Sequence, residues 1–274
     1  MKKGVILILT FIVLVSIVAI TLSFLTMVFY RTKGSGYDKL SSQSFWLAEA
    51  GLQKAIWNLK TPVASGGRGE DWTTVGTTEN LATGSYTMEV ERWDWALSAH
   101  NATASASSSE AGHDPDNGID GNDATWWESA DKPRPPFYEN IVIAFPYRLT
   151  INKARFVVPV GASQQRPSSY EWHVSTDGVN FTTVYTDTNN DSLDVTNEFP
   201  AQANVNYLRL WVAKTGGGAT ALGVKVATVE AIGSKITVTA AVDILNRKIE
   251  QTVAVDDAGQ EAYDQIDWDE LPAL

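Results

Sequence analysis

A long uncharged segment near the N-terminus constrains this chain more than any other feature of its sequence. The segment runs from Val5 to Tyr30, 26 residues rich in Leu, Ile, Val and Phe, and it follows Lys2-Lys3. As an α-helix it would be roughly 39 Å long, enough to cross a hydrocarbon core of about 30 Å. It is followed by Arg31-Thr32-Lys33, and not by the small-residue site at which a secretory signal is cleaved. We therefore expect a retained transmembrane helix over residues 5–30, and the basic residues on both sides leave its orientation open.

An amphipathic helix is predicted directly after this segment, over residues 31–60. Gly34 and Gly36 lie between the two helical patterns, and each lowers helix stability by about 1 kcal/mol relative to Ala. We therefore expect a bent or melted joint at these glycines. The apolar positions of the second helix recur at helical spacing: Leu40, Leu47, Ala48, Leu52, Ala55, Ile56 and Leu59.

Two motifs in this region resemble a known family. Lys2-Lys3-Gly4 precedes the apolar segment, and Phe45-Trp46-Leu47-Ala48-Glu49-Ala50-Gly51-Leu52 follows it. Together they are similar to the start of minor type IV pilins and type II secretion pseudopilins, over about residues 1–60. The resemblance implies that residues 1–4 are a leader, which a prepilin peptidase removes between Gly4 and Val5. It also implies that Val5 is then methylated and that the helix packs among other pilin-like subunits.

The chain departs from this family at Leu9, where major pilins usually carry a glutamate. The resemblance implies that this glutamate pairs with the N-terminal amine of a neighbouring subunit inside the apolar bundle, where a buried charge without a partner is costly. A subunit with Leu9 cannot offer that partner to the subunit above it. We therefore expect a rare position at or near the tip of a filament. A plain single-pass membrane anchor is the alternative.

Alternating segments on both sides of the central region predict a small antiparallel sheet. Gly84–Trp93 reads as one strand, and residues 236–242 and 248–255 read as a hairpin that turns around Asn246-Arg247. They resemble the strands of a pilin head made of residues 61–95 and 234–255, in which Tyr86–Arg92 would pair with the hairpin. Residues 96–233 are then an insert in one connection of that head, at the kind of exposed site where folds tolerate insertion.

The insert is predicted to be a β-sandwich. Short alternating segments such as Ile141–Phe145, Tyr170–Val174 and Tyr207–Val212 are separated by turn signals such as Asp177-Gly178. The fold class is therefore α+β with an all-β insert: a long N-terminal helix packed on a small antiparallel sheet, plus a sandwich.

Several motifs of the insert occur in the order of one family. They are Asn117–Trp127, Ile151–Phe156, Ser168–Gly178 and Tyr207–Leu210. Over about residues 96–233 they resemble discoidin-type domains, the coagulation factor 5/8 type C family. This galactose-binding-domain-like family includes the family 32 carbohydrate-binding modules. The resemblance implies a jelly-roll sandwich with a ligand site in the loops at one end.

Oxygen-bearing side chains concentrate between residues 120 and 125. Calcium takes six to eight oxygen ligands of mixed type, although Asp-Gly-Asn is also a common turn. In the resembled family such a loop holds a structural Ca²⁺ together with a glutamate near the C-terminal end of the domain. The expected calcium ligands are Asp120, Asn122, Asp123, Thr125 and Glu230.

The resemblance also implies that a sugar ring stacks on an aromatic side chain of the end loops. We expect Trp126 to be this platform and Trp127 to lie in the core, since most Trp side chains are largely buried. Hydrogen-bond donors are expected from Gln164, Gln165 and Arg166. Val160 stands where galactose-binding members often have an arginine, which weighs against galactose as the ligand.

Composition excludes several function classes. A net charge of −11 argues against nucleic acid as a partner, since phosphate binding needs clustered Lys and Arg. The chain has no cysteine, its 3 histidines lack metal-ligand spacing, and no Gly-x-Ser-x-Gly motif is present. We expect no enzymatic activity. Residues 256–274 contain 7 carboxylates and no Lys or Arg, which predicts a solvated acidic tail.

These observations predict a membrane-anchored, pilin-like surface protein of a bacterial-type cell envelope, with its C-terminal part outside the cytoplasm. Its calcium-stabilised insert would serve adhesion or glycan recognition, with a glycan or a surface protein as ligand. One alternative is a structural minor pseudopilin whose insert makes only protein contacts. Another is an anchored lectin that does not polymerise.

Overall fold

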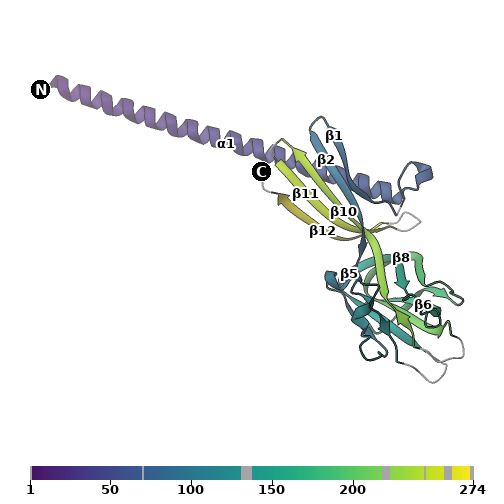
Figure 1. The fold of residues 1–274 in the computed structure, drawn as a ribbon. Helices are drawn as coiled ribbons and strands as arrows, with labels where there is room; N and C mark the ends of the chain where they lie inside the picture. Colours follow the sequence, from purple (N-terminus) through teal and green to yellow (C-terminus); the bar gives the residue numbers. More distant parts are fainter. Residues whose placement is uncertain are drawn as a thin grey trace.

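The fold has three parts: a long helix, a sheet packed against the C-terminal part of that helix, and a β-sandwich at one end of the sheet (Figure 1). The computed structural model describes residues 2–69, 71–130, 138–217, 223–243, 245–255 and 261–271. The helices are α1 (Lys2–Lys60), η1 (Val63–Ser65), η2 (Ser98–His100) and η3 (Pro115–Gly118). The strands are β1 (Thr74–Leu81), β2 (Gly84–Asp94), β3 (Thr103–Ala106), β4 (Trp127–Glu128), β5 (Glu139–Val157), β6 (Pro167–Ser175), β7 (Thr182–Asp187), β8 (Asp194–Thr215), β9 (Lys225–Val226), β10 (Thr228–Val242), β11 (Leu245–Val255) and β12 (Glu261–Leu271). The predicted α+β class with an all-β insert is confirmed.

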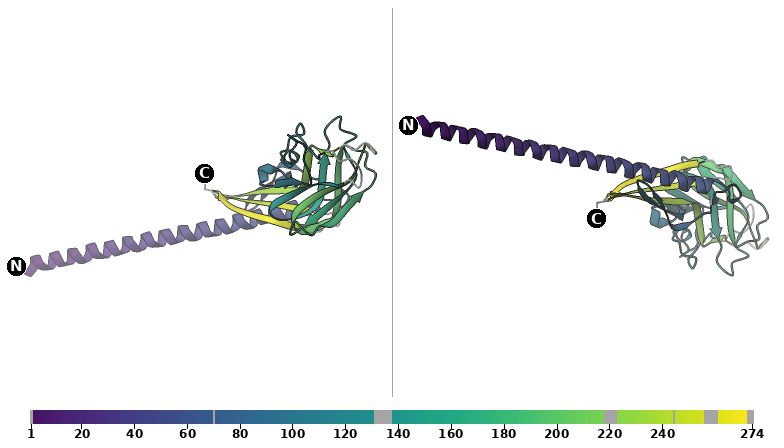
Figure 2. Two further views of the ribbon diagram at one scale, coloured as in Figure 1. Left: turned by 90° about the horizontal axis from the view of Figure 1, so that it is seen from below. Right: turned by 90° about the horizontal axis from the view of Figure 1, so that it is seen from above.

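Helix α1 is continuous over 59 residues and passes through Gly34 and Gly36 without a break. The expected joint is therefore wrong. Two glycines cost about 2 kcal/mol together, which is less than the loss of several backbone hydrogen bonds at an interruption. Figure 2 shows from two sides that the N-terminal part of α1 extends far beyond all of the strands. Among the described residues, α1 is the one helix that is long and apolar enough to cross a membrane.

The C-terminal part of α1 packs on the head sheet, which comprises β1, β2, β10, β11 and β12. The apolar face predicted from helical spacing is the face that packs here. A Cβ added at Gly51 would lie 2.7 Å from a methyl group of Val238, so glycine permits the close approach of helix and sheet. The buried residues of this core are Leu47, Ala48, Leu52, Ala55, Ile56, Leu59, Tyr86, Met88, Val90, Ile236, Val238, Ala240, Val242, Ile249 and Val253.

The head sheet pairs its strands in the antiparallel order β1-β2-β10-β11-β12. The predicted pairing of the strand around Tyr86 with the later hairpin is present, since Tyr86 lies opposite Ala240. The hairpin itself turns between Val242 and Leu245, with Asp243 at a φ of 53°, and not at Asn246-Arg247 as expected. Arg247 is instead a strand residue whose guanidinium donates to Ser41 Oγ of α1 at 3.2 Å.

The acidic C-terminal region contributes a further strand to the head. β12 pairs with β11 from Asn246 opposite Leu271 to Val255 opposite Glu261. This part of the chain is therefore not the solvated tail that its charge predicts. Residues 256–260 and 272–274 lie outside the described residues.

The sandwich is inserted between two neighbouring strands of the head. The chain leaves the head at the end of β2 and returns along β10, and Asp94 of β2 still lies opposite Ile232 of β10. Trp95 is buried at this crossing, and a Cβ on Gly233 would lie 2.1 Å from its indole ring. We call this crossing the junction. Trp95 packs so closely on Gly233 that only glycine at this position leaves room for the indole.

Within the sandwich, β5 and β8 pair along nearly their whole length, with register shifts between Ala144 and Lys153. Such irregularities bend a strand and increase its twist. β3 pairs with the first half of β5, and β10 pairs with the second half. The largest fully buried side chains of this core are Trp95, Trp127, Trp172, Tyr170, Phe156, Ile119, Ile141 and Ile143.

Candidate functional site

The acidic loop between η3 and β4 is closed by its own side chains. Asp120 accepts from the Asn122 amide at 2.9 Å and from Thr125 Oγ1 at 2.7 Å through its two carboxylate oxygens. Asn122 Oδ1 accepts from the Ala124 amide at 3.1 Å. These contacts are the turn-forming bonds expected of Asp and Asn. The loop therefore gathers the predicted oxygen atoms of Asp120, Asn122 and Thr125 in one place.

Glu230 does not join this loop. Its carboxylate accepts from Arg155 Nη1 at 2.6 Å and also forms an ion pair with Arg92. Thr228, two residues earlier on the same face of β10, reaches the loop instead and donates to Asp123 Oδ1 at 2.7 Å. The expected remote carboxylate of Glu230 is therefore held by two arginines, away from the oxygens of the loop. Among the residues that the structure describes, no three His, Asp or Glu side chains converge as a metal site.

The two adjacent tryptophans have different environments. Trp127 is fully buried and its indole nitrogen donates to the Ser108 carbonyl at 3.0 Å, so it is a core residue as predicted. Trp126 is half-buried, and the ring of His113 stacks on it with a centroid distance of 4.5 Å and an interplanar angle of 17°. Lys225 Nζ lies 5.1 Å from the same indole centroid. His113 therefore covers one face of the Trp126 indole, so this side chain is not a fully open platform.

Glu128 organises the side chains around Trp126. Its carboxylate accepts from Trp126 Nε1 at 3.2 Å, from Gln165 Nε2 at 2.9 Å and from Lys225 Nζ at 3.1 Å. His113 Nε2 lies 3.9 Å from the same carboxylate. We call these five residues the Glu128 cluster. The Glu128 side chain is 15% exposed, so these contacts are partly shielded from water and stronger than those of a free surface pair.

The predicted donor loop, residues 164–166, is joined to the cluster through Gln165. The Gln165 carbonyl accepts from the Lys225 amide at 3.1 Å, which fixes β9 against the loop. Arg166 is turned toward the backbone: its Nε donates to the Asn190 carbonyl at 3.3 Å, and its Nη1 donates to the Ser163 carbonyl. Gln164 has an exposed side chain. Gln165 thus belongs to the Glu128 cluster, whereas Arg166 holds the loops in shape.

Three members of the cluster, His113, Glu128 and Lys225, were missed from the sequence. Glu128 directly follows the Trp126-Trp127 pair, so its proximity to the predicted site was visible. Its partners Gln165 and Lys225 are far away in the chain, and only the pairing of β4 with β9 brings Lys225 opposite Glu128. The cluster combines an aromatic stack with a cation, an amide and a carboxylate, which together can contact both the apolar face and the hydroxyl groups of a polar ligand.

Comparison with known proteins finds a family profile that matches most of the sandwich. Residues 101–225 match the profile of the F5/8 type C domain. The matched region contains all five members of the Glu128 cluster, with Lys225 as its last residue. No curated protein matches the chain significantly.

Solved structures of carbohydrate-binding modules are similar to about half of the chain. Chitosan-binding module 1 of a chitosanase/glucanase from Paenibacillus sp. IK-5 is 29% identical and matches over 51% of this chain and 98% of its own, with a TM-score of 0.44. Module 2 of the same enzyme, in complex with chitotriose, is 28% identical over 51% of this chain and 98% of its own, with a TM-score of 0.43. A family 32 module from C. perfringens in complex with galactose is 18% identical over 52% of this chain and 99% of its own, with a TM-score of 0.45.

Proposed function

We propose, from the premise that residues 101–225 form an F5/8 type C domain, that this chain is an anchored surface protein which binds glycans at the Glu128 cluster. The family match supports a domain of the type that includes carbohydrate-binding modules. The observation that carries the proposal is the convergence of Trp126, Gln165 and Lys225 on the Glu128 carboxylate. The Glu128 carboxylate fixes one aromatic and two donor side chains in place before a ligand binds, which reduces the entropy lost on binding.

In this proposal the ligand sits on the stacked rings of His113 and Trp126. The donors of Gln165 and Lys225 then bind sugar hydroxyl groups, and Glu128 acts mainly by orienting them. The site is shallow, which limits affinity for a single sugar to roughly the millimolar to tens-of-micromolar range. Useful adhesion then requires many copies or a polymeric glycan, because avidity multiplies weak sites without new contacts.

The remaining parts of the proposal concern the anchor and the ion. We assign membrane attachment to the apolar part of α1, which projects away from the strands, and we place the sandwich outside the cytoplasm of a bacterial-type envelope. Pilin-like processing before Val5 and assembly with other pilin-like subunits remain part of this hypothesis, as does a structural Ca²⁺ at the loop of Asp120 and Asp123. The chain has no enzymatic role in this proposal.

The test is a glycan array probed with the full chain in detergent micelles, with Glu128→Gln and Trp126→Ala compared with Gln164→Ala. Glu128→Gln retains the size of the side chain but removes the charge that orients Lys225. We expect both cluster variants to lose at least fivefold in apparent affinity for any bound glycan, while Gln164→Ala changes it less than twofold. Binding that is equal in all three variants would place the ligand elsewhere on the domain.

If no glycan binds to the wild-type chain, the proposal fails, and the alternative is that the sandwich makes only protein contacts. Co-purification with pilin-like subunits from the native membrane then separates a minor pseudopilin from an anchored lectin that does not polymerise.

A further inference from the structure

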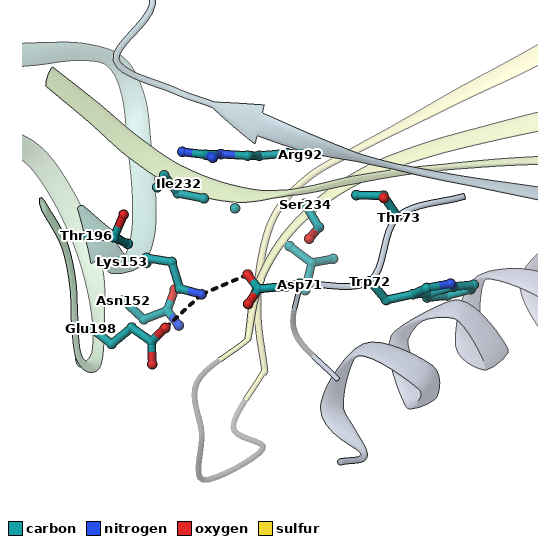
Figure 3. A pocket seen from close by; sticks show the side chains of 12 residues that line it. Asp71, Trp72, Thr73, Arg92, Asn152, Lys153, Thr196, Glu198, Ile232 and Ser234 are labelled. Carbon is teal, nitrogen blue, oxygen red and sulfur yellow. Dashed lines mark hydrogen bonds and ion pairs between the residues drawn. The ribbon is translucent and has the colours of Figure 1, made fainter. Parts of the chain in front are cut away.

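A cavity of about 520 Å³ lies at the junction between the head and the sandwich. Figure 3 shows its lining side chains, which come from both parts of the molecule. The head supplies the segment of Asp71 and Trp72 and part of β2, while the sandwich supplies β5 and β8. A cavity of this size is within the range of small-molecule sites. It exists only because the sandwich is inserted at this point of the head.

Lys153 is the central cation of this cavity. Its side chain is 8% exposed, and its Nζ lies 2.9 Å from Glu198 Oε1 and 3.1 Å from Asp71 Oδ1. The two carboxylates differ in their surroundings. Glu198 belongs to β8 of the sandwich, as Lys153 belongs to β5, whereas Asp71 reaches across from the head and its side chain is 87% exposed.

The other lining residues include a second cation, apolar side chains, and hydroxyl and amide groups. Figure 3 shows Arg92 and Lys153 on either side of Ile232; Arg92 comes from β2 of the head and Lys153 from β5 of the sandwich. Ile232 and Trp72 give the cavity apolar wall. The remaining polar lining comes from Thr73, Asn152, Thr196 and Ser234.

We propose that this junction cavity binds an acidic sugar, a uronic acid or the uronate residue of a longer glycan, whose carboxylate takes the place of Asp71 at Lys153. The chemistry of the lining matches that class: a buried ammonium for the carboxylate, and hydroxyl and amide groups for the ring hydroxyls. Without a ligand, the Asp71 carboxylate occupies the position at Lys153 that the carboxylate of the sugar would take. This inference is independent of glycan binding at the Glu128 cluster.

The exchange is physically cheap for the protein. An ion pair with a carboxylate as exposed as that of Asp71 is weak, because water screens it. Glu198 stays on Lys153 during the exchange, so the buried ammonium always retains a negative partner. A ligand carboxylate that is enclosed by the cavity is screened less than Asp71 and binds Lys153 more strongly.

The test is calorimetric titration of the full chain in detergent micelles with D-glucuronate, with D-glucose as the neutral counterpart. Asp71→Asn removes the internal competitor, and we expect it to tighten glucuronate binding by about 1.5- to 5-fold, the range set by the weakness of an exposed ion pair. Asp191→Asn is the matched control, since it removes an equal charge from an exposed residue outside the cavity lining. It should leave the affinity unchanged.

Lys153→Gln should weaken glucuronate binding roughly tenfold, because it removes a charge-assisted hydrogen bond. Arg92→Gln, at a half-exposed position, provides a second loss variant if Lys153→Gln does not fold. Equal binding of glucose and glucuronate, or an affinity that Asp71→Asn leaves unchanged or lowers, would overturn the proposal. Loss of glucuronate binding in Trp126→Ala would also overturn it, since it would place the ligand at the Glu128 cluster.

Discussion

Asp94 occupies the junction where the chain passes from β2 into the sandwich, and its charge should make stability depend on pH. Its Oδ1 accepts from the backbone amides of Ala96 and Ala231, each at 2.9 Å. Burial, with a smaller contribution from the nearby Glu230 charge, raises the pKa of this carboxyl from its ordinary value of 3.8 to about 7. The two amide bonds and Arg92 act in the opposite direction but do not compensate.

The sign of the effect follows from proton binding. Between pH 3.8 and about 7 the folded chain holds the Asp94 proton while the unfolded chain has released it. The free energy of unfolding therefore falls as the pH rises through this window, by at most about 1.4 kcal/mol per unit. The total over the roughly three units is at most about 4 kcal/mol, and the loss is complete above the folded pKa.

Asp94→Asn keeps the Oδ1 acceptor and cannot ionise, so it isolates this contribution. We expect the variant to match wild type within about 1 kcal/mol near pH 4.5 and to be more stable than wild type at pH 8. The measurement is urea unfolding of the full chain in detergent micelles at several pH values, followed by tryptophan fluorescence. Asp191→Asn, which removes an equal charge at an exposed position, is the matched control.

A difference between Asp94→Asn and wild type that stays constant from pH 4.5 to pH 8 would refute this reasoning. A variant that is less stable than wild type at pH 8 would refute it as well, since that result would mean that the carboxylate is stabilised by its two amide bonds more than it is destabilised by burial.

Three further predictions follow from the loop, the junction and the N-terminus. Calcium should raise the melting temperature of the full chain, Asp120→Ala should abolish the rise and Glu230→Gln should preserve it, because Arg92 and Arg155 hold that glutamate; a rise that depends on Glu230 would contradict this assignment. Gly233→Ala should destabilise the fold by about 1–3 kcal/mol in urea unfolding, because its Cβ would overlap the indole of Trp95, and a neutral effect would show that the junction is looser than described. Mass spectrometry of the protein from its native membrane should find a methylated chain that begins at Val5, and an intact Met1 in cells with an active prepilin peptidase would exclude pilin-like processing.

The arrangement of the head could be predicted because its signals are local and mutually consistent. Helical spacing from Leu47 to Leu59 identified the face of α1 that is buried, and strand alternation around Tyr86 identified the strand that pairs with β10. By contrast, the strand character of residues 261–271 could not be predicted from charge. A run of carboxylates indicates that a segment is soluble, but not whether it pairs as a strand. β12 pairs because β11 offers it an edge, and that edge is a property of the assembled sheet.

The candidate site could likewise be predicted only where its signals are local in the sequence. Trp127 was predicted as core because burial is the usual state of Trp, and the Asp120 loop was predicted because its oxygens are close in sequence. The sequence pointed to Glu230, whereas Thr228 reaches the loop; both lie on one face of β10, and only the final register decides between them. Glu128 was missed for a related reason: its role depends on partners that reach it only in the folded sandwich.

The insertion of the sandwich between β2 and β10 determines how a pulling force would travel through the molecule. If a bound surface draws the sandwich away from the membrane, both strands are pulled in the same direction, so the bonds that join them to each other carry little load. The load falls on the outer pairings, β2 with β1 and β10 with β11, in which hydrogen bonds lie across the direction of pulling and must break together. The packing of α1 on the same strands then passes the tension to the helix, so the head sheet resists in shear and does not unzip one bond at a time.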